Sequence, residues 1–106
     1  MRFMVFVIDT NSNSGSTAEL RSIDQFNAEL EGKGSLVMAA GIAGSSTGTL
    51  IDNREGRNEV HDGSLNGEEF YSGFWIIEAS TESLAKQIAS DASKACNRKV
   101  ELRPFL

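Results

Sequence analysis

Two stretches of the chain, Arg2–Ile8 and Tyr71–Ala79, carry mostly β-branched and aromatic residues with few polar ones between them. A strand with one exposed face alternates between apolar and polar residues, so this pattern predicts two strands that are covered on both faces. Side chains two residues apart share a face of a strand, which places Tyr71 and Trp75 on the same side. We expect the two strands to be neighbours at the centre of one sheet.

Two further segments show the spacing of amphipathic helices. Ser16 and Glu19 are three residues apart, as in the capping box that begins a helix, and apolar residues then recur every three or four positions up to Leu30. Glycines just beyond Leu30 end this helix. The second helix starts from a cap at residue 80 or 81 and carries a stripe of small apolar residues suited to packing on a sheet.

The remaining apolar segments predict shorter strands. Ser35–Ala43 and Lys99–Arg103 each form one strand, and Thr49–Asn53 with Asn58–His61 form a hairpin. The resulting order is β-α-β-(ββ)-β-α-β. It predicts an α+β fold, a ferredoxin-like βαββαβ sandwich with an accessory β-hairpin, in which both helices cover one face of an antiparallel sheet. Residues 1–106 then form a single domain.

The predicted sheet has one face without helices, although its two central strands are apolar on both faces. A monomer would expose an apolar patch larger than the roughly 300–600 Å² that monomeric proteins show. Two copies packed sheet to sheet cover both patches, and two-fold dimers are the commonest closed assemblies. We therefore expect the partner of this chain to be a second copy, in a homodimer through the sheet face.

Composition narrows the classes of function. With 106 residues, 40% hydrophobic and 24% charged, the chain suits one globular domain. Its net charge of −5 disfavours nucleic acid and anionic membranes as partners, and no apolar run approaches the roughly 20 residues of a transmembrane helix. We expect a soluble, cytoplasmic protein. One cysteine and one histidine exclude an internal disulfide and leave a zinc site short of ligands, so we expect no metal and no cofactor.

Three segments together resemble one family. Residues 61–65 read His-Asp-Gly-Ser-Leu, residues 72–80 read Ser-Gly-Phe-Trp-Ile-Ile-Glu-Ala-Ser, and residues 100–104 read Val-Glu-Leu-Arg-Pro. This combination resembles the signature of the YCII-related, DGPF-domain proteins and spans nearly the whole chain, although Ser64 and Leu65 stand where that family has Pro and Phe. The resemblance implies a dimeric α/β barrel of ferredoxin-like domains with a cleft near the motif aspartate, Asp62. Its relatives suggest small organic ligands.

Asp62 is the first candidate for a catalytic residue. A carboxylate beside an apolar sheet face can have a raised pKa and act as a general base. Asp-Gly is also a turn dipeptide whose carboxylate caps its own backbone, and the turn chemistry favours this second interpretation. His61 can act as an acid or base near neutral pH, but it lies on the opposite face from Asp62 if the strand continues. A solvent-facing histidine at a strand end is the simpler interpretation.

Four neighbouring residues are candidates for ligand binding, and two of them have clear structural alternatives. Gly63 and Ser64 belong to the motif loop. Trp75 can stack on a ligand, although an aromatic residue in a central strand more often belongs to a core or an interface. Arg54 can hold an anionic ligand, although pairing with a nearby surface carboxylate is favoured.

Two functions fit these observations. The first is a homodimer that binds a small organic ligand in a cleft on the sheet face, and that is an enzyme if Asp62 works as a base. The alternative is a non-catalytic dimeric interaction or regulatory module, in which Met4, Phe6 and Trp75 pack solidly across the dimer. An open pocket lined by Asp62 would favour the first function.

Overall fold

The computed structural model of the protein describes residues 1–11, 15–65 and 67–106. In chain order its elements are β1 (Arg2–Thr10), α1 (Thr17–Gly32), β2 (Leu36–Gly41), η1 (Ser45–Thr47), β3 (Thr49–Asp52), η2 (Arg54–Gly56), β4 (Glu59–Asp62), β5 (Glu69–Glu78), α2 (Glu82–Cys96) and β6 (Lys99–Pro104). The predicted order of strands and helices is confirmed. The main differences in bounds are that β2 is shorter than expected and that β5 begins two residues earlier, at Glu69.

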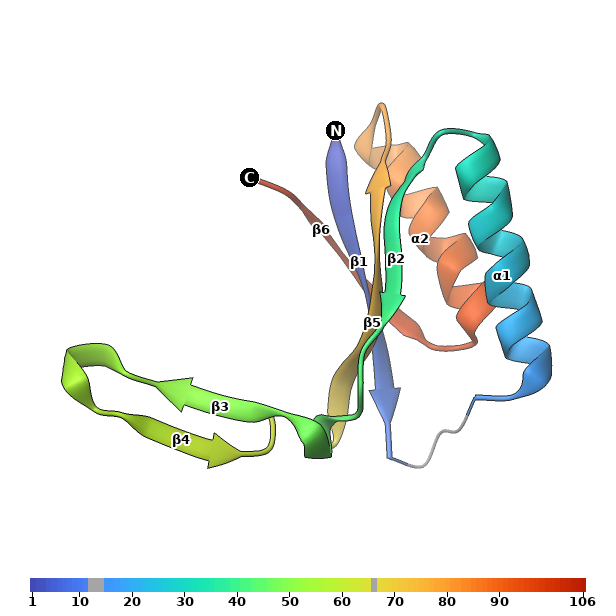
Figure 1. Ribbon diagram of the computed structural model, residues 1–106. Helices are drawn as coiled ribbons and strands as arrows, with labels where there is room; N and C mark the ends of the chain where they lie inside the picture. Colours follow the sequence, from blue (N-terminus) through green and yellow to red (C-terminus); the bar gives the residue numbers. More distant parts are fainter. Residues whose placement is uncertain (12–14, 66) are drawn as a thin grey trace.

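Four strands form an antiparallel sheet in the order β2-β5-β1-β6, with β1 and β5 at the centre as predicted. Both helices pack against one face of this sheet, side by side (Figure 1). This arrangement confirms the α+β, ferredoxin-like fold. Strand β6 lies at an edge and ends at Pro104, where a missing backbone N–H breaks no ladder of hydrogen bonds.

Both helices begin at the predicted caps. The hydroxyl of Ser16 accepts a hydrogen bond from the backbone N–H of Glu19 at 3.2 Å, and the Glu19 carboxylate accepts one from the N–H of Ser16 at 3.4 Å. The hydroxyl of Thr81 accepts from the N–H of Leu84 at 3.1 Å. Each cap pairs backbone donors that the first turn of a helix leaves unsatisfied, which fixes where the chain enters the helix.

The core lies between the helices and the sheet. Alternate side chains of β1 and β5 face the helices, and Phe3, Val5, Trp75 and Ile77 are each at most 3% exposed. Alanines along α2 let that helix approach the sheet closely. Cys96, at the end of α2, is 1% exposed and belongs to this core.

The register of β1 and β5 shifts at Ser72, which makes this residue the extra one of a β-bulge. Beyond the bulge, Tyr71 lies opposite Ile8 and moves to the face away from the helices. Its ring stacks there on Phe6, with ring centroids 4.4 Å apart. The prediction that Tyr71 shares a face with Trp75 is therefore wrong, because strict alternation holds only while the register is unbroken.

The second face of the sheet, which we call the open face, carries no helix from the described part of the chain (Figure 1). Its central side chains are apolar, and none of them reaches the burial of the core. They are Met4, Phe6, Ile8, Met38, Phe74 and Ile76. The prediction that helices leave one apolar face uncovered is confirmed for the single chain.

Strands β3 and β4 form the predicted accessory hairpin, residues 49–62, which we call the arm. Figure 1 shows the arm extending away from the sheet, on the side opposite the helices. Ile51 and Val60 are cross-strand partners in the arm and are 70% and 63% exposed. One face of the arm therefore carries two exposed apolar side chains.

Candidate functional site

Two hollows in the described chain fall within the size range of small-molecule sites, roughly 300–1,000 Å³. The helix-side cleft lies between α1 and the sheet and has a volume of about 400 Å³. The open-face hollow lies where residues 42–48 and 64–65 meet the open face, and its volume is about 560 Å³. The two hollows differ in whether their polar side chains already have hydrogen-bond partners within the described chain.

The walls of the helix-side cleft are mostly apolar. Trp75 and Ala39 line it from the sheet, and Ile23 lines it from α1. Gly73 allows β5 and β2 to approach closely, because a Cβ atom at this position would come within 2.9 Å of the backbone oxygen of Ala40. This close approach makes the strand side of the cleft a rigid wall.

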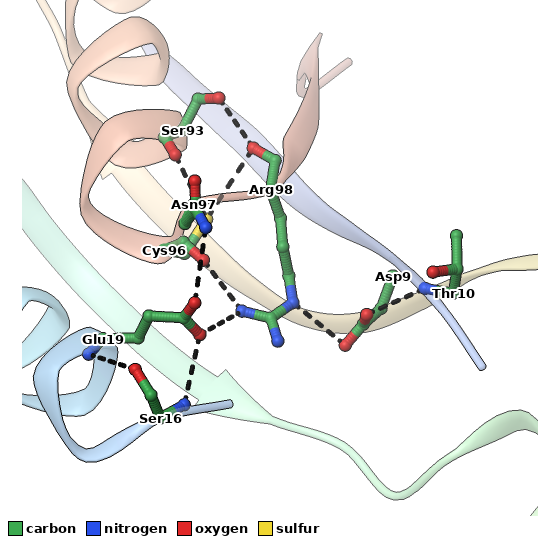
Figure 2. Close-up of polar contacts among 8 residues, drawn as sticks. All are labelled: Asp9, Thr10, Ser16, Glu19, Ser93, Cys96, Asn97 and Arg98. Atoms are coloured by element: carbon green, nitrogen blue, oxygen red, sulfur yellow. Dashed lines mark hydrogen bonds and ion pairs between the residues drawn. The ribbon is translucent and has the colours of Figure 1, made fainter. Parts of the chain in front are cut away.

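Three segments that are far apart in sequence bring charged side chains together (Figure 2), and all three side chains line this cleft. The Arg98 Nη1 atom donates to the Glu19 carboxylate at 3.1 Å and to the backbone oxygen of Cys96 at 2.8 Å. Its Nε atom lies 3.1 Å from an Asp9 carboxylate oxygen, as an ion pair without hydrogen-bond geometry. The Arg98 side chain is 8% exposed. We call Asp9, Glu19 and Arg98 the charged cluster.

The end of α2 sets the position of Arg98. Asn97 ends the helix in the left-handed conformation, with φ 53°, which turns the chain back toward the sheet. The Ser93 hydroxyl then donates to the backbone oxygen of Arg98 at 2.6 Å. The Asn97 side chain also donates to Glu19 at 3.4 Å, which links the end of α2 to the start of α1.

Two side chains that line the cleft keep donor groups without a partner among the described residues. The Arg98 Nη2 atom makes no contact in the cluster (Figure 2). Asn27 accepts a hydrogen bond from the Trp75 indole N–H at 2.6 Å, and its own Nδ2 group has no partner in the described chain. A guanidinium that is mostly buried but has one open edge is a typical group for planar recognition of ligand oxygens.

The contacts within the charged cluster favour the charged forms of Glu19 and Arg98. Hydrogen bonds from Asn97 and Arg98 hold the pKa of the Glu19 carboxyl below its usual value. Desolvation lowers the pKa of Arg98, but its attraction to Glu19 and Asp9 outweighs this effect and raises the pKa overall. Two carboxylates and one guanidinium give a formal charge of −1. The cluster therefore suits hydroxyl and carbonyl groups better than a multiply charged anion.

We expect Glu19 to make the protein sensitive to acid. Because its pKa in the folded state lies below the ordinary 4.5, its contribution to the free energy of unfolding is complete above that pH and is lost as pH falls through the folded value. Urea unfolding should separate wild type from Glu19→Gln at pH 7, and this gap should be smaller at pH 3. Glutamine keeps an oxygen for the Ser16 cap. Glu31→Gln, on the exposed side of α1, is the control, and an equal gap for Glu19→Gln at both pH values would contradict this role.

The open-face hollow has polar side chains that satisfy one another. The Tyr71 hydroxyl donates to Glu101 at 3.0 Å, and Arg103 donates to the Tyr71 oxygen at 3.0 Å and also to Glu101. The Arg103 guanidinium lies 5.0 Å from the centre of the Phe6 ring, as a cation–π contact. Ligand groups would have to replace these contacts, so this hollow is the weaker candidate for a site.

The structure places Asp62 and His61 outside both hollows. Both are exposed in β4, and this strand continues through both residues, so their side chains lie on opposite faces of the arm and form no dyad. The predicted cleft exists as the open-face hollow, but Ser64 lines it and Asp62 does not, because the arm carries Asp62 away. Gly63 has φ 110°, which confirms the turn. The catalytic role of Asp62 and His61 stays a prediction.

The other candidates have structural roles. Arg54 is 77% exposed and donates to Asp52 at 3.0 and 2.7 Å, which confirms the favoured surface pairing. Trp75 belongs to the core and faces the helices, so the idea that it packs across a dimer is wrong, although it does line the helix-side cleft.

Two other kinds of feature, a metal centre and a membrane-spanning helix, were sought among the described residues. Among the described residues, no group of three or more His, Cys, Asp or Glu side chains could hold a metal ion. Neither helix of the described ranges is both long and apolar enough to cross a membrane. Burial raises the pKa of the Cys96 thiol, so this cleft residue stays protonated near neutral pH and is a poor nucleophile.

Sequence reasoning missed the residues that make the helix-side cleft polar. It treated Glu19 as a helix cap only, and it assigned no role in a site to Asp9, Asn27 or Arg98. The predicted topology could have indicated this cluster, because the end of β1, the start of α1 and the end of α2 meet at one end of a ferredoxin-like sheet.

Comparison with known proteins gives one solved structure with a similar fold and one matching family. The chain is similar in structure to 5-chloro-2-hydroxyhydroquinone dehydrochlorinase from Burkholderia phenoliruptrix, solved with 2,5-dihydroxybenzoquinone, with 17% identity, a TM-score of 0.50, and coverage of 100% of this chain and 94% of that one. At this identity the likeness shows the fold alone. No curated protein sequence matches the chain. The profile of the YCII-related domain matches residues 1–105. The chain therefore belongs to the YCII-related domain family.

Proposed function

We propose that this protein binds a small, hydroxylated ring compound in the helix-side cleft, and that it does so as a homodimer paired through the open face. One observation carries the ligand proposal. The Arg98 side chain is 8% exposed and is held by two carboxylates, yet its Nη2 atom has no partner in the described chain and stands at the end of an apolar cleft. Nη2 is not among the buried polar atoms without a partner, so its N–H groups are accessible and can donate to ligand oxygens in the cleft.

The chemistry of the cleft defines the ligand class. The rings and aliphatic groups along its length suit a flat apolar body, and Arg98 and Asn27 supply donors for ligand oxygens. The carboxylates of the charged cluster can accept hydrogen bonds from ligand hydroxyls. The ligand in the structural relative, 2,5-dihydroxybenzoquinone, is a molecule of this kind, a single ring that carries both hydroxyl and carbonyl groups.

The uncovered apolar side chains of the open face support the dimer. Met38 is 51% exposed, and its neighbours across the centre of the sheet are apolar as well. A second copy is the simplest partner, because pairing two open faces buries the exposed apolar side chains of both copies. The pairing would leave the helix-side cleft of each copy open, since that cleft lies on the other side of the sheet.

Trp75 offers a direct test of ligand binding. It is the only tryptophan in the chain and lines the helix-side cleft, so its fluorescence should report occupancy. Titration with 2,5-dihydroxybenzoquinone, catechol and hydroquinone should give saturable changes. Arg98→Lys keeps the charge but loses the planar fork, and we expect it to weaken binding at least tenfold, as for the loss of one charged hydrogen bond of about 1.5–3 kcal/mol. Arg54→Lys, on the arm, is the control and should bind as wild type does.

Asp62→Asn separates this proposal from the site predicted around the motif. If Asp62→Asn abolishes binding and Arg98→Lys does not, the ligand belongs near the arm and Asp62 regains its predicted role. If Asp62→Asn binds normally, the helix-side cleft stands. An absence of saturable binding across the whole panel would favour the alternative function, a dimeric interaction module.

A further inference from the structure

The arm has no apolar support within the described part of its own chain. Its two strands pair only with each other, and Ile51 and Val60 share one face of the hairpin, 70% and 63% exposed. An isolated two-stranded hairpin is marginally stable in water and normally needs packing against another element. At the root of the arm, the Gly63 N–H donates to the Gly48 oxygen at 2.7 Å, which fixes where the arm leaves the body.

The single chain is more extended than a domain of its size should be. Its radius of gyration is 15.6 Å, against about 13 Å expected for a compact chain of this length. Its accessible surface is 7190 Å², whereas a folded monomer of 11.5 kDa exposes about 5,800 Å². The excess of about 1,400 Å² exceeds the roughly 800 Å² that each partner buries in a standard protein–protein interface. The chain thus has the surface that a stable dimer needs.

The direction and length of the arm indicate that this excess surface contacts a second copy of the chain. The arm leaves the body on the side of the open face, where a second copy packed sheet to sheet would lie (Figure 1). Sheets that pack face to face are about 10 Å apart. Each arm strand has four residues, which span roughly 13 Å before the turn begins. The arm is therefore long enough to cross the gap and lie along the flank of the second copy.

We propose that the arm is a clasp for a second copy of this chain, and that the face formed by Ile51 and Val60 packs against that copy. The inference rests on the dimer of the proposed function, and it adds that the arm is the structural element that holds the two copies together. By the two-fold symmetry each copy gives one arm and receives one, so the clasp forms twice in every dimer.

The test compares two sides of the same hairpin. Ile51→Asp with Val60→Asp places charge on the proposed contact face, whereas Leu50→Asp places the same group on the opposite face, at a position that is 40% exposed. Sedimentation equilibrium of the full chain should show the dimer dissociation constant raised at least tenfold by the first pair and changed less than threefold by Leu50→Asp. Equal effects of the two faces, or no effect of either, would overturn the clasp.

Removal of the arm provides a second measurement that does not depend on the folding of the variant hairpin. Residues 49–62 can be replaced by a two-residue link, because the Gly48 oxygen and the Gly63 nitrogen are already 2.7 Å apart. The shortened chain should stay folded by circular dichroism and dimerise at least tenfold more weakly. A shortened chain that dimerises as wild type does would overturn the clasp and leave the dimer intact. A monomeric wild type would instead remove the dimer and the clasp together.

Discussion

Ile76→Asp and Phe6→Asp are each expected to dissociate the proposed dimer into monomers. Both side chains lie on the open face, where Ile76 pairs with Met4 and Phe6 pairs with Phe74. A carboxylate at either position would be buried between two apolar sheets without a partner, and at a cost of about 3 kcal/mol the dissociation constant would rise more than a hundredfold. The helix side of the sheet, which holds the core, is not touched by either change.

The two substitutions should raise the dissociation constant by different amounts. Phe6 lies under Arg103, whose guanidinium is 5.0 Å from its ring centre, so an aspartate there has a cation nearby. The direct cross-strand neighbours of Ile76 are Met4 and Met38, which are both apolar, and we therefore expect the stronger effect from Ile76→Asp. Sedimentation velocity at micromolar concentration measures the change. Leu84→Asp, on the exposed side of α2, is the control and should remain dimeric. A well-folded wild type that is already monomeric would contradict the dimer itself.

The fold could be predicted because its signals are local and agree with one another. Ser16 with Glu19, and Thr81 at the second helix, fixed the helix starts, and both caps are present. The doubly apolar strands could only be central ones, and the structure places them there. Each of these inferences depends on residues within a few positions of one another, where capping and periodicity are reliable guides.

The candidate site could not be predicted in the same way because its polar residues meet only after folding. Asp9 follows a strand, Glu19 caps a helix, and Arg98 follows another helix, and each has an ordinary local explanation. Their meeting depends on the left-handed turn at Asn97 and on the packing of α1 beside α2. No short motif records such a meeting, so the inference requires the topology first.

Two side chains lie elsewhere than the sequence pattern indicated, and the physical causes are separate. Tyr71 lies on the unexpected face because the single extra residue of the bulge, Ser72, breaks the alternation between the residues before it and those after it. Asp62 lies away from the hollow because β4 continues through it and carries it into the arm, whereas a loop would have kept it near the sheet. Turn residues such as Gly63 mark where the chain reverses but not which way the reversed segment extends.

Trp75→Ala is expected to lower the free energy of unfolding by about 3–5 kcal/mol, the usual loss when a large buried aromatic side chain is truncated. Trp75 is 3% exposed, packs edge-on against Phe26 with ring centroids 5.5 Å apart, and donates to Asn27 at 2.6 Å. The midpoint of thermal unfolding should fall by roughly 12–40 °C, at about 4–8 °C for each kcal/mol in a domain of this size. Circular dichroism is the appropriate measurement, since this variant has no tryptophan.

Trp75→Phe separates the contribution of the ring from that of the indole N–H. The phenyl ring keeps most of the packing, so the variant should lose only the hydrogen bond to Asn27, about 1 kcal/mol. In Asn27→Ala the indole N–H remains without its partner and the loss should reach about 1–3 kcal/mol, whereas the double variant should lose less than the sum of the two single ones. If Trp75→Ala instead costs below about 1 kcal/mol and abolishes ligand binding, then Trp75 is primarily a ligand contact. The core would then depend on Phe3, Val5 and Ile77, and the cleft would be wider in solution than the packing of Trp75 implies.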